Sequence, residues 1–153
     1  MEIDCAIAVI NSQNVKGIVI FDEQSDFSIK ISFDLKALNS TVADGLHGCH
    51  IHEYGDTSNG CLSMGEHYNP YRGVHGGLNE HGNHAGDLGN ISFTNGICKG
   101  RVILRNVRLE ELIGRGLVIH EFEDDLGRGS NLESKKTGNS GGRIACGVIA
   151  ISK

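Results

Sequence analysis

The stretch FSIKISF (27–33) alternates strictly between apolar and polar side chains. Because successive side chains of a β-strand point to opposite faces of the sheet, this stretch predicts a strand with one buried face. Two apolar, β-branched runs precede it, at 5–10 and 17–21, and the polar turn between them predicts a β-hairpin. Two further runs, at 89–93 and 97–104, flank an Asn-Gly pair, which is a strong hairpin signal.

About eight strands are expected in all. Runs at 117–120 and 144–151 and the segment around Cys49 and Ile51 add to those above, while no stretch of useful length has a helical period. The sequence therefore predicts an all-β protein. A closed or nearly closed antiparallel barrel is the arrangement that best protects the strand edges.

Length and composition predict one domain, 1–153, with one compact core. The net charge of −5 argues against nucleic-acid binding. No apolar run approaches the roughly 18 residues that span a bilayer, so no membrane association is expected. The first residues include Glu2 and Asp4 where an export signal would carry basic residues, and we expect a soluble, cytoplasmic protein.

Two long segments, 54–88 and 121–142, have no strand pattern and are rich in glycine or charge. Loops of this length in a small domain are either disordered or held by something other than secondary structure. The first one contains three histidines and an aspartate that together make a complete tetrahedral zinc set, with no position left for water: His67, His75, His84 and Asp87. Such a closed site is typical of structural zinc, whose binding energy would order the loop.

His50 and His52 stand two residues apart in a predicted strand, so both imidazoles project from one face while Cys49 and Ile51 project into the core. This pair alone is weak evidence for a metal. His120, from a distant strand, adds a third nitrogen ligand. An imidazole set without thiolate suits copper or zinc, and a tetragonal all-nitrogen site suits Cu(II).

At this point the chain resembles the copper/zinc superoxide dismutase family, essentially over its whole length. Five motifs carry the resemblance, in the family's order and spacing: GLHGCHIHEYGD (45–56), GEHYNP (65–70), HAGDLGN (84–90), LVIHEFEDDLG (117–127) and KTGNSGGRIACGVI (136–149). The resemblance implies an eight-stranded Greek-key antiparallel barrel, an immunoglobulin-like sandwich with two long functional loops. It also implies disproportionation of superoxide to dioxygen and hydrogen peroxide, by a redox-cycling copper bridged to a structural zinc.

The resemblance also assigns the site. It implies one copper on His50, His52, His67 and His120, and one zinc on His67, His75, His84 and Asp87. His67 is then shared by both metals and acts in catalysis, together with Arg143, which docks the anion. The resemblance implies two further residues outside the ligand sets. Asp124 would hydrogen-bond one histidine of each metal, and His47 would lie beneath the copper without binding it. His81 has no role and is expected to be a solvated loop residue.

The family's remaining features concern the loops and the assembly. The resemblance implies a Cys61–Cys146 disulfide, leaving three other cysteines as small core residues. It implies substrate guidance by four residues of the second loop: Glu133, Lys135, Lys136 and Thr137. It further implies a homodimer and a possible copper-delivery chaperone as partner. The chain departs from the animal enzymes at Leu132 and Lys135, and between 104 and 113 it carries the unfamiliar Arg105 and Arg108.

Two other functions remain open on the sequence. A catalytically silent metal-binding domain could share this barrel, but such domains usually lack copper ligands or the docking arginine, and both are kept here. A zinc hydrolase would need an open zinc position and a general base, whereas this zinc set is closed. Metal content and superoxide turnover would separate the three.

Overall fold

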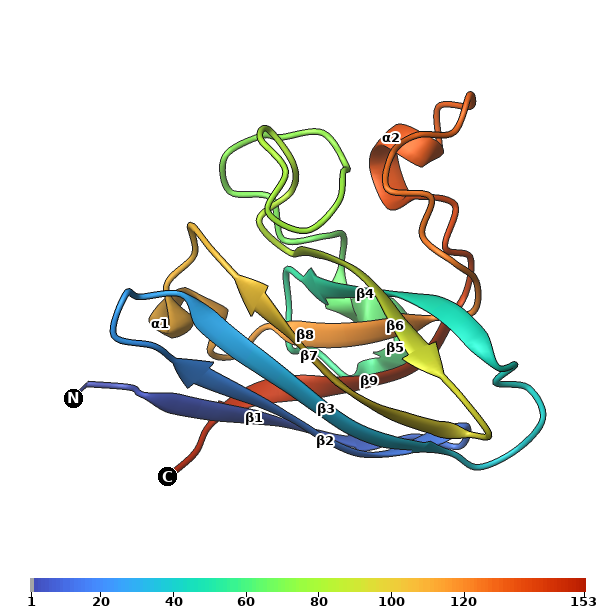
Figure 1. The fold of residues 1–153 in the computed structure, drawn as a ribbon, viewed down its shortest axis with the longest axis horizontal. Helices are drawn as coiled ribbons and strands as arrows, with labels where there is room; N and C mark the ends of the chain where they lie inside the picture. The colour runs from blue at the N-terminus through green and yellow to red at the C-terminus, as the bar shows by residue number, and fades with distance from the viewer. Residues whose placement is uncertain (1) are drawn as a thin grey trace.

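The computed structural model describes residues 2–153, and within that range the chain forms nine strands and three short helical segments. The strands are β1 (Cys5–Asn11), β2 (Val15–Glu23), β3 (Ile29–Ala37), β4 (Gly45–His52), β5 (Ser58–Cys61), β6 (Asp87–Phe93), β7 (Ile97–Leu104), β8 (Gly116–His120) and β9 (Arg143–Ile151). The helical segments are η1 (Leu62–Met64), α1 (Leu109–Leu112) and α2 (Ser134–Thr137). Eight strands form one antiparallel sheet in the order β6-β4-β8-β9-β1-β2-β3-β7, which curls into a nearly closed barrel (Figure 1).

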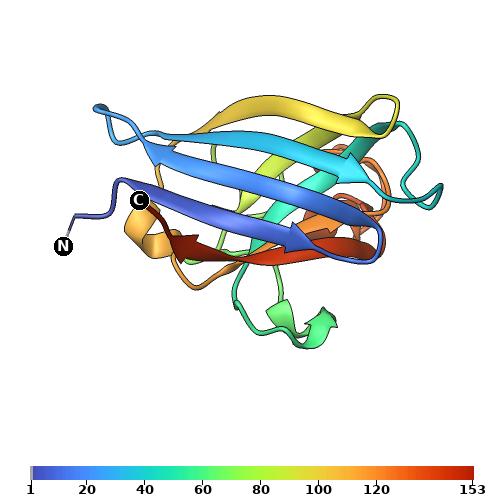
Figure 2. The same ribbon diagram turned by 90° about the horizontal axis from the view of Figure 1, so that it is seen from below.

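The barrel has two four-stranded halves that meet where β1 pairs with β9, over only three residue pairs. Figure 2 shows β1, β2 and β3 side by side, with β9 next to β1. The connections from β3 to β4, from β6 to β7 and from β7 to β8 each cross between the halves, as in a Greek key. The predicted all-β barrel is confirmed.

The alternating stretch that predicted the fold forms most of β3. Ile29, Ile31 and Phe33 are buried in the core, whereas Lys30 and Ser32 are only partly covered. Phe27 was wrongly included in this strand. It lies in the β2–β3 turn, where φ is 64° and the side chain is 57% exposed.

The expected hairpin between 89–93 and 97–104 is only half correct. The Thr94–Ile97 turn forms, with positive φ at Asn95 and Gly96 as a tight hairpin turn requires. However, β6 and β7 stand at opposite ends of the strand order, so they are the two free edges of the barrel and not neighbours in the sheet. A tight turn between two apolar runs is compatible with either arrangement.

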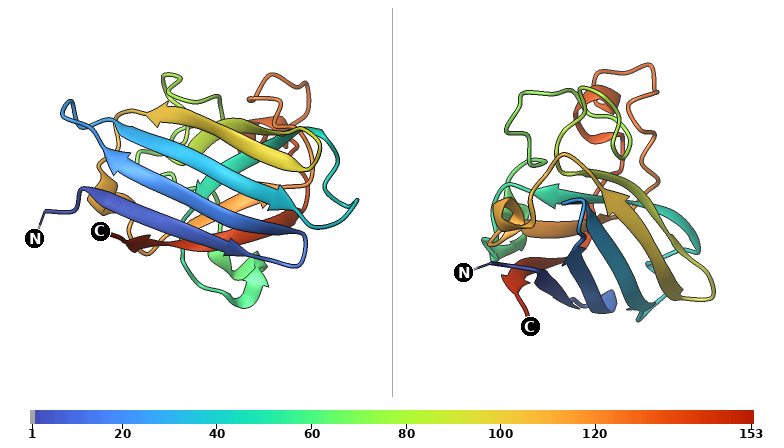
Figure 3. Two further views of the ribbon diagram at one scale, coloured as in Figure 1. Left: turned by 60° about the horizontal axis from the view of Figure 1, so that its bottom comes forward. Right: turned by 60° about the vertical axis from the view of Figure 1, so that its left-hand side comes forward.

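The second loop and the later part of the first, which leads into β6, stand on the same side of the barrel, whereas the β5–η1 part of the first loop projects elsewhere (Figure 1; Figure 3). Both loops contain short regular segments that the sequence did not predict, β5 and η1 in the first loop and α2 in the second. The Cys61–Cys146 disulfide joins the first loop to β9. No helix among the described residues is long and apolar enough to cross a membrane.

Candidate metal centre

Strand β4 places His50 and His52 on the face opposite Cys49 and Ile51, which are fully buried in the apolar core. Its neighbour β8 ends at His120, and an isolated bridge brings His67 of the long loop to His52. All four histidines are buried. The antiparallel pairing and the loop bridge therefore gather imidazoles from three distant parts of the chain.

Each of these four imidazoles uses one ring nitrogen to hold its orientation and turns the other toward a common point. His52 Nδ1 lies 2.9 Å from the Gly65 carbonyl, and His120 Nδ1 lies 3.2 Å from the Gly141 carbonyl. Their Nε2 atoms are 3.4 Å apart. One ring nitrogen of each residue lies within 4.8 Å of all the others in this first set, His50, His52, His67 and His120.

Two buried ring nitrogens in the described part of the chain have no hydrogen-bond partner, His50 Nδ1 and His67 Nε2. Both belong to the first set. Leaving a buried polar atom unpaired costs about 1–3 kcal/mol, so such atoms need an explanation. A metal bound at this point would satisfy both nitrogens, and the first set therefore fits a metal with four nitrogen ligands.

The second set brings three imidazole nitrogens close to one carboxylate oxygen. Asp87 Oδ1 lies 3.1 Å from His67 Nδ1, 2.9 Å from His75 Nδ1 and 3.3 Å from His84 Nδ1. The Nδ1 atoms of His67 and His84 are 3.3 Å apart. Four ligand atoms each about 2.0 Å from a tetrahedral zinc would stand about 3.3 Å from one another. These residues therefore fit zinc.

His50 also comes within 4.8 Å of the ligand atoms of His67, His75 and Asp87. We assign the fourth position of the second set to His84 instead, because its Nδ1 is 3.3 Å from both His67 Nδ1 and Asp87 Oδ1. The Nε2 of His50 is already 2.7 Å from a different carboxylate, that of Asp124. His50 therefore belongs to the first set.

Asp124 joins the two sets from outside. Its Oδ2 lies 2.7 Å from His50 Nε2, and its Oδ1 lies 2.8 Å from His75 Nε2. Asn90 fixes the Asp124 backbone, accepting from its N–H at 2.7 Å and donating to its carbonyl at 3.0 Å. Gly138 has a φ of +71°, and any side chain there would overlap Asp124 Oδ1. The carboxylate thus orients one ring from each set.

The protonation preferences of the first set suit metal binding, whereas that of His75 opposes it. Burial lowers the pKa of His52 to about 2 and that of His120 to about 4, and it holds the pKa of His50 well below its usual range. Burial also disfavours the charged form of His75, but hydrogen bonds to Asp124 and Asp87 outweigh it and raise its pKa to about 9. Neutral imidazoles are the ligand form, and a metal at His75 Nδ1 would displace a proton.

A cleft of about 300 Å³ opens beside the first set. His52, His67 and His120 contribute to its wall, together with Arg143. The Arg143 guanidinium is held by two carbonyls, donating from Nη1 to Cys61 at 2.8 Å and from Nη2 to Gly65 at 2.6 Å. The predicted anion-docking arginine therefore faces the metal cluster in a fixed orientation.

The four predicted guidance residues do not all reach this cleft. Glu133 and Thr137 line it, and their side chains are hydrogen-bonded at 2.8 Å. Lys135 and Lys136 instead line a neighbouring hollow beside His84, which shares Glu66 and His67 with the cleft. Sequence reasoning missed four residues of the cleft wall, although all four lie inside the quoted motifs: Glu66, Phe122, Asn139 and Gly141.

The other predicted residues fall as follows. His47 is buried with each ring nitrogen against a backbone carbonyl, Nδ1 on His120 and Nε2 on Ala43, so neither nitrogen faces a metal. His81 is exposed. Among the three free cysteines, Cys49 and Cys98 are buried and Cys5 is partly exposed.

The structure combines an antiparallel barrel with two adjoining sets of metal-ligating residues that share one imidazole. One of these sets lies beside a cleft lined by an arginine. This combination defines a class of two-metal oxidoreductase. The model of the copper/zinc superoxide dismutase family matches residues 15–149. The chain belongs to this family. It is an oxidoreductase that disproportionates superoxide to dioxygen and hydrogen peroxide, and its cofactors are one copper and one zinc.

Individual relatives agree with this over nearly the whole chain. A copper-zinc superoxide dismutase of Dictyostelium discoideum is 44% identical, over 97% of this chain and 98% of the relative. One from Xenopus laevis is 43% identical, over 96% and 95% respectively. The crystal structure of the clock protein EA4 superposes with a TM-score of 0.93 at 38% identity, covering 99% of this chain and 97% of that one.

Proposed function

We propose that copper is held by the first set and zinc by the second, with His67 as the shared ligand. The observation that carries this proposal is the orientation of His67, whose Nδ1 lies 3.1 Å from Asp87 Oδ1 while its Nε2 is buried without a protein partner. Copper, when bound, supplies one-electron exchange with superoxide, and zinc, which has no redox chemistry, supports the loop. Asp124 and backbone carbonyls orient the imidazole rings.

In this proposal His67 moves a proton at Nε2, on the cleft side of its ring. His67 takes up a proton at this nitrogen in one half of the cycle and gives it to the product in the other. Between the two half-reactions the proton is held beside the cleft. Arg143 docks the anion, because its guanidinium lines the same cleft and its carbonyl partners fix its direction. Asp124 is a positioning residue that acts through His50 and His75.

Two measurements on one purified sample test the proposal: metal content and superoxide consumption. We expect one copper and one zinc per chain and rapid turnover. A silent metal-binding domain would hold metal without turnover. A zinc hydrolase would carry zinc alone, and either result would contradict the assignment.

We propose that Arg143 steers the substrate more strongly than Lys135 does. The segment 121–143 has five acids and four bases, so its summed charge does not attract an anion, but its acids are concentrated at the start and its bases at the end. Arg143 lines the cleft, whereas Lys135 lines the adjacent hollow and donates from Nζ to the Gly127 carbonyl.

Arg143→Ala is therefore expected to lower the second-order rate by about tenfold or more, the range of electrostatic steering, and Lys135→Ala by clearly less. Both should flatten the dependence of the rate on ionic strength, because screening acts on the same charges. Stopped-flow kinetics across a salt series makes the comparison. A wild-type rate that does not fall between low and physiological salt would contradict the steering proposal while leaving the metal chemistry untouched.

We also propose a homodimer through the face formed by Tyr54, Gly55, Ile113, Gly114 and Ile151. In support, Gly55 packs so closely on the Gly114 carbonyl that a side chain at Gly55 would overlap it, and the side chains of Tyr54 and Ile151 are at least half exposed. Small and apolar residues suit a two-fold contact. Ile151→Glu is expected to give a folded monomer, and sedimentation of the unaltered protein as a monomer at micromolar concentration would overturn the proposal.

We further propose that the protein works in the cytoplasm. Its three free cysteines suit a reducing compartment. The disulfide and the copper would then have to be installed there, and a copper-delivery chaperone is the partner we propose for that step. Copper loading of the metal-free protein in a reducing buffer, with and without such a chaperone, tests this partner.

A further inference from the structure

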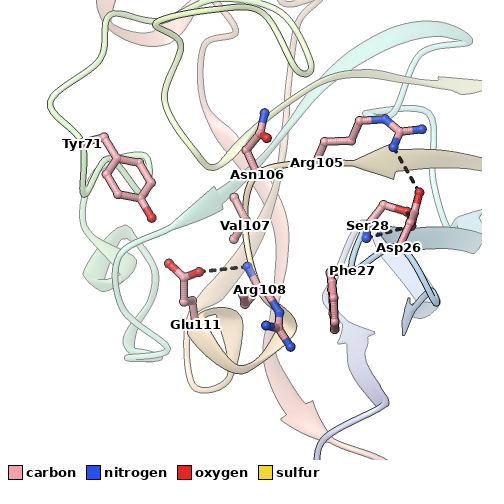
Figure 4. Close-up of a pocket in the computed structure, with 9 residues that line it drawn as sticks. All are labelled: Asp26, Phe27, Ser28, Tyr71, Arg105, Asn106, Val107, Arg108 and Glu111. Atoms are coloured by element: carbon pink, nitrogen blue, oxygen red, sulfur yellow. Dashed lines mark hydrogen bonds and ion pairs between the residues drawn. The ribbon is translucent and has the colours of Figure 1, made fainter.

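A second cleft lies between three segments that are far apart in the sequence, and none of the residues assigned to metal lines it. These are the β2–β3 turn, the long β5–β6 loop at Tyr71, and the β7–α1 connection at 105–108 (Figure 4). The cleft is open to solvent and has a volume of about 420 Å³, which is within the range of small-molecule sites. A smaller hollow shares Tyr71 and 105–107 with it, so the groove continues along the connection.

Two aromatic rings stand at the sides of this cleft and are largely exposed, Phe27 by 57% and Tyr71 by 69%. The backbone of Phe27 has a φ of 64°, a conformation that costs a bulky residue about 1–3 kcal/mol and that glycine would adopt freely. Phe27 therefore occupies a strained position without contributing to the core. Such residues are typical of binding sites.

Arginine side chains complete the wall. The Arg108 guanidinium lies 4.4 Å from the centre of the Phe27 ring and is fixed by Glu23 at 2.8 Å. Arg105 and Asp26 form a longer pair at 3.4 Å, with both side chains more than half exposed. Exposed pairs of this kind contribute about 0–1 kcal/mol, so pairing with Asp26 does not prevent Arg105 from also binding an anionic ligand.

The carboxylates that face the cleft are already engaged. Asp26 accepts from both the backbone N–H and the hydroxyl of Ser28. Glu111 accepts from the Arg108 N–H at 2.8 Å and from the Tyr68 hydroxyl. The donors of Arg105 that do not face Asp26 are therefore the groups that can take up a further anion.

We propose that this cleft binds a small ligand whose planar ring carries an anionic oxygen group. The ring stacks between Tyr71 and the Phe27–Arg108 pair, and the anionic group binds Arg105. Guanidinium groups bind phosphate and carboxylate in the same bidentate manner, and guanidinium groups also stack on aromatic faces. The ligand is thus an aryl or nucleobase anion, and its anionic group can be either a phosphate or a carboxylate.

Isothermal titration of the copper- and zinc-loaded enzyme tests the proposal with two probes, adenosine monophosphate for the phosphate class and indole-3-acetate for the carboxylate class. We expect saturable binding of at least one. Adenosine lacks the anionic group and inorganic phosphate lacks the ring, so each should bind at least about tenfold more weakly than adenosine monophosphate. Absence of saturable binding for both probes, or binding of inorganic phosphate as tight as that of adenosine monophosphate, would overturn the proposal.

Variants locate the binding. Arg105→Ala should weaken the probe about tenfold or more, whereas Arg101→Ala, which removes the same charge from exposed β7 outside the cleft, should leave affinity unchanged. Phe27→Gly should weaken binding without lowering the melting temperature, because it relieves the positive φ. Superoxide turnover should stay unchanged in all three. Equal losses in Arg105→Ala and Arg101→Ala would mean that only overall charge matters and would refute the site.

Discussion

His67→Ala is expected to abolish superoxide turnover and to release zinc at the same time. The residue contributes Nδ1 to the second set, 3.1 Å from Asp87 Oδ1, and Nε2 to the first set, so one substitution removes a ligand from both metals. Turnover should fall by at least about 100-fold, the lower end of what a positioned proton carrier contributes. Zinc affinity should fall by more than about 100-fold, since even an outer-shell partner is worth 10–100-fold.

His120→Ala is the matched control for this double effect. His120 places Nε2 in the first set, 3.4 Å from His52 Nε2, and its Nδ1 lies 3.2 Å from the Gly141 carbonyl. Its loss should therefore abolish turnover while zinc stays bound. Metal analysis and superoxide consumption on both variants make the comparison, and full activity with both metals bound in His67→Ala would refute the shared role.

The core strands were predictable because the alternation of side chains is a local property. In β3 the residues Ile29, Ile31 and Phe33 face the core as their spacing requires. Phe27 continues the same alternation in the sequence. However, Asp26 accepts a hydrogen bond from the Ser28 N–H and so closes a local turn, and the strand begins only at Ile29. The sequence alternation cannot detect such a turn.

The order of strands in the sheet depends on contacts across the chain. The Asn95-Gly96 turn has the expected backbone, yet it joins the two free edges of the barrel. Local turn chemistry fixes how the chain reverses and does not decide whether the flanking strands pair. The same limit applies to Lys135 and Lys136, because only the path of α2 decides that they line the hollow beside His84.

The metal residues were found partly by type and partly by resemblance. Three imidazoles and Asp87 in one glycine-rich loop predict zinc from chemistry alone. Nothing in residue type distinguishes Asp124 from Glu123 and Asp125 beside it, and only the family motif singled it out. The choice between Nδ1 and Nε2 in each ring depends on hydrogen bonds to distant groups, such as the Gly65 carbonyl that accepts from His52, and no sequence pattern reports it.

The disulfide links the stability of the fold to the geometry of the cleft. Cys61 and Cys146 are separated by 85 positions, and the Cys61 carbonyl is one of the two acceptors that hold Arg143. Breaking the bond therefore frees the loop end that fixes the docking arginine. Both a loss of stability and a loss of activity should follow.

Replacing both Cys61 and Cys146 by serine is expected to lower the free energy of unfolding by on the order of 4 kcal/mol, the value for closing a loop of this length. The second-order rate should also fall, because Arg143 loses a fixed acceptor, while His52 and His120 keep their carbonyl partners and copper remains bound. Denaturant unfolding of metal-loaded protein measures the first effect, and Cys5→Ser, at a partly exposed free thiol, is the control that should change neither. A thiol count on the unfolded, unreduced protein decides the premise, since three reactive thiols require the bond and five would contradict it.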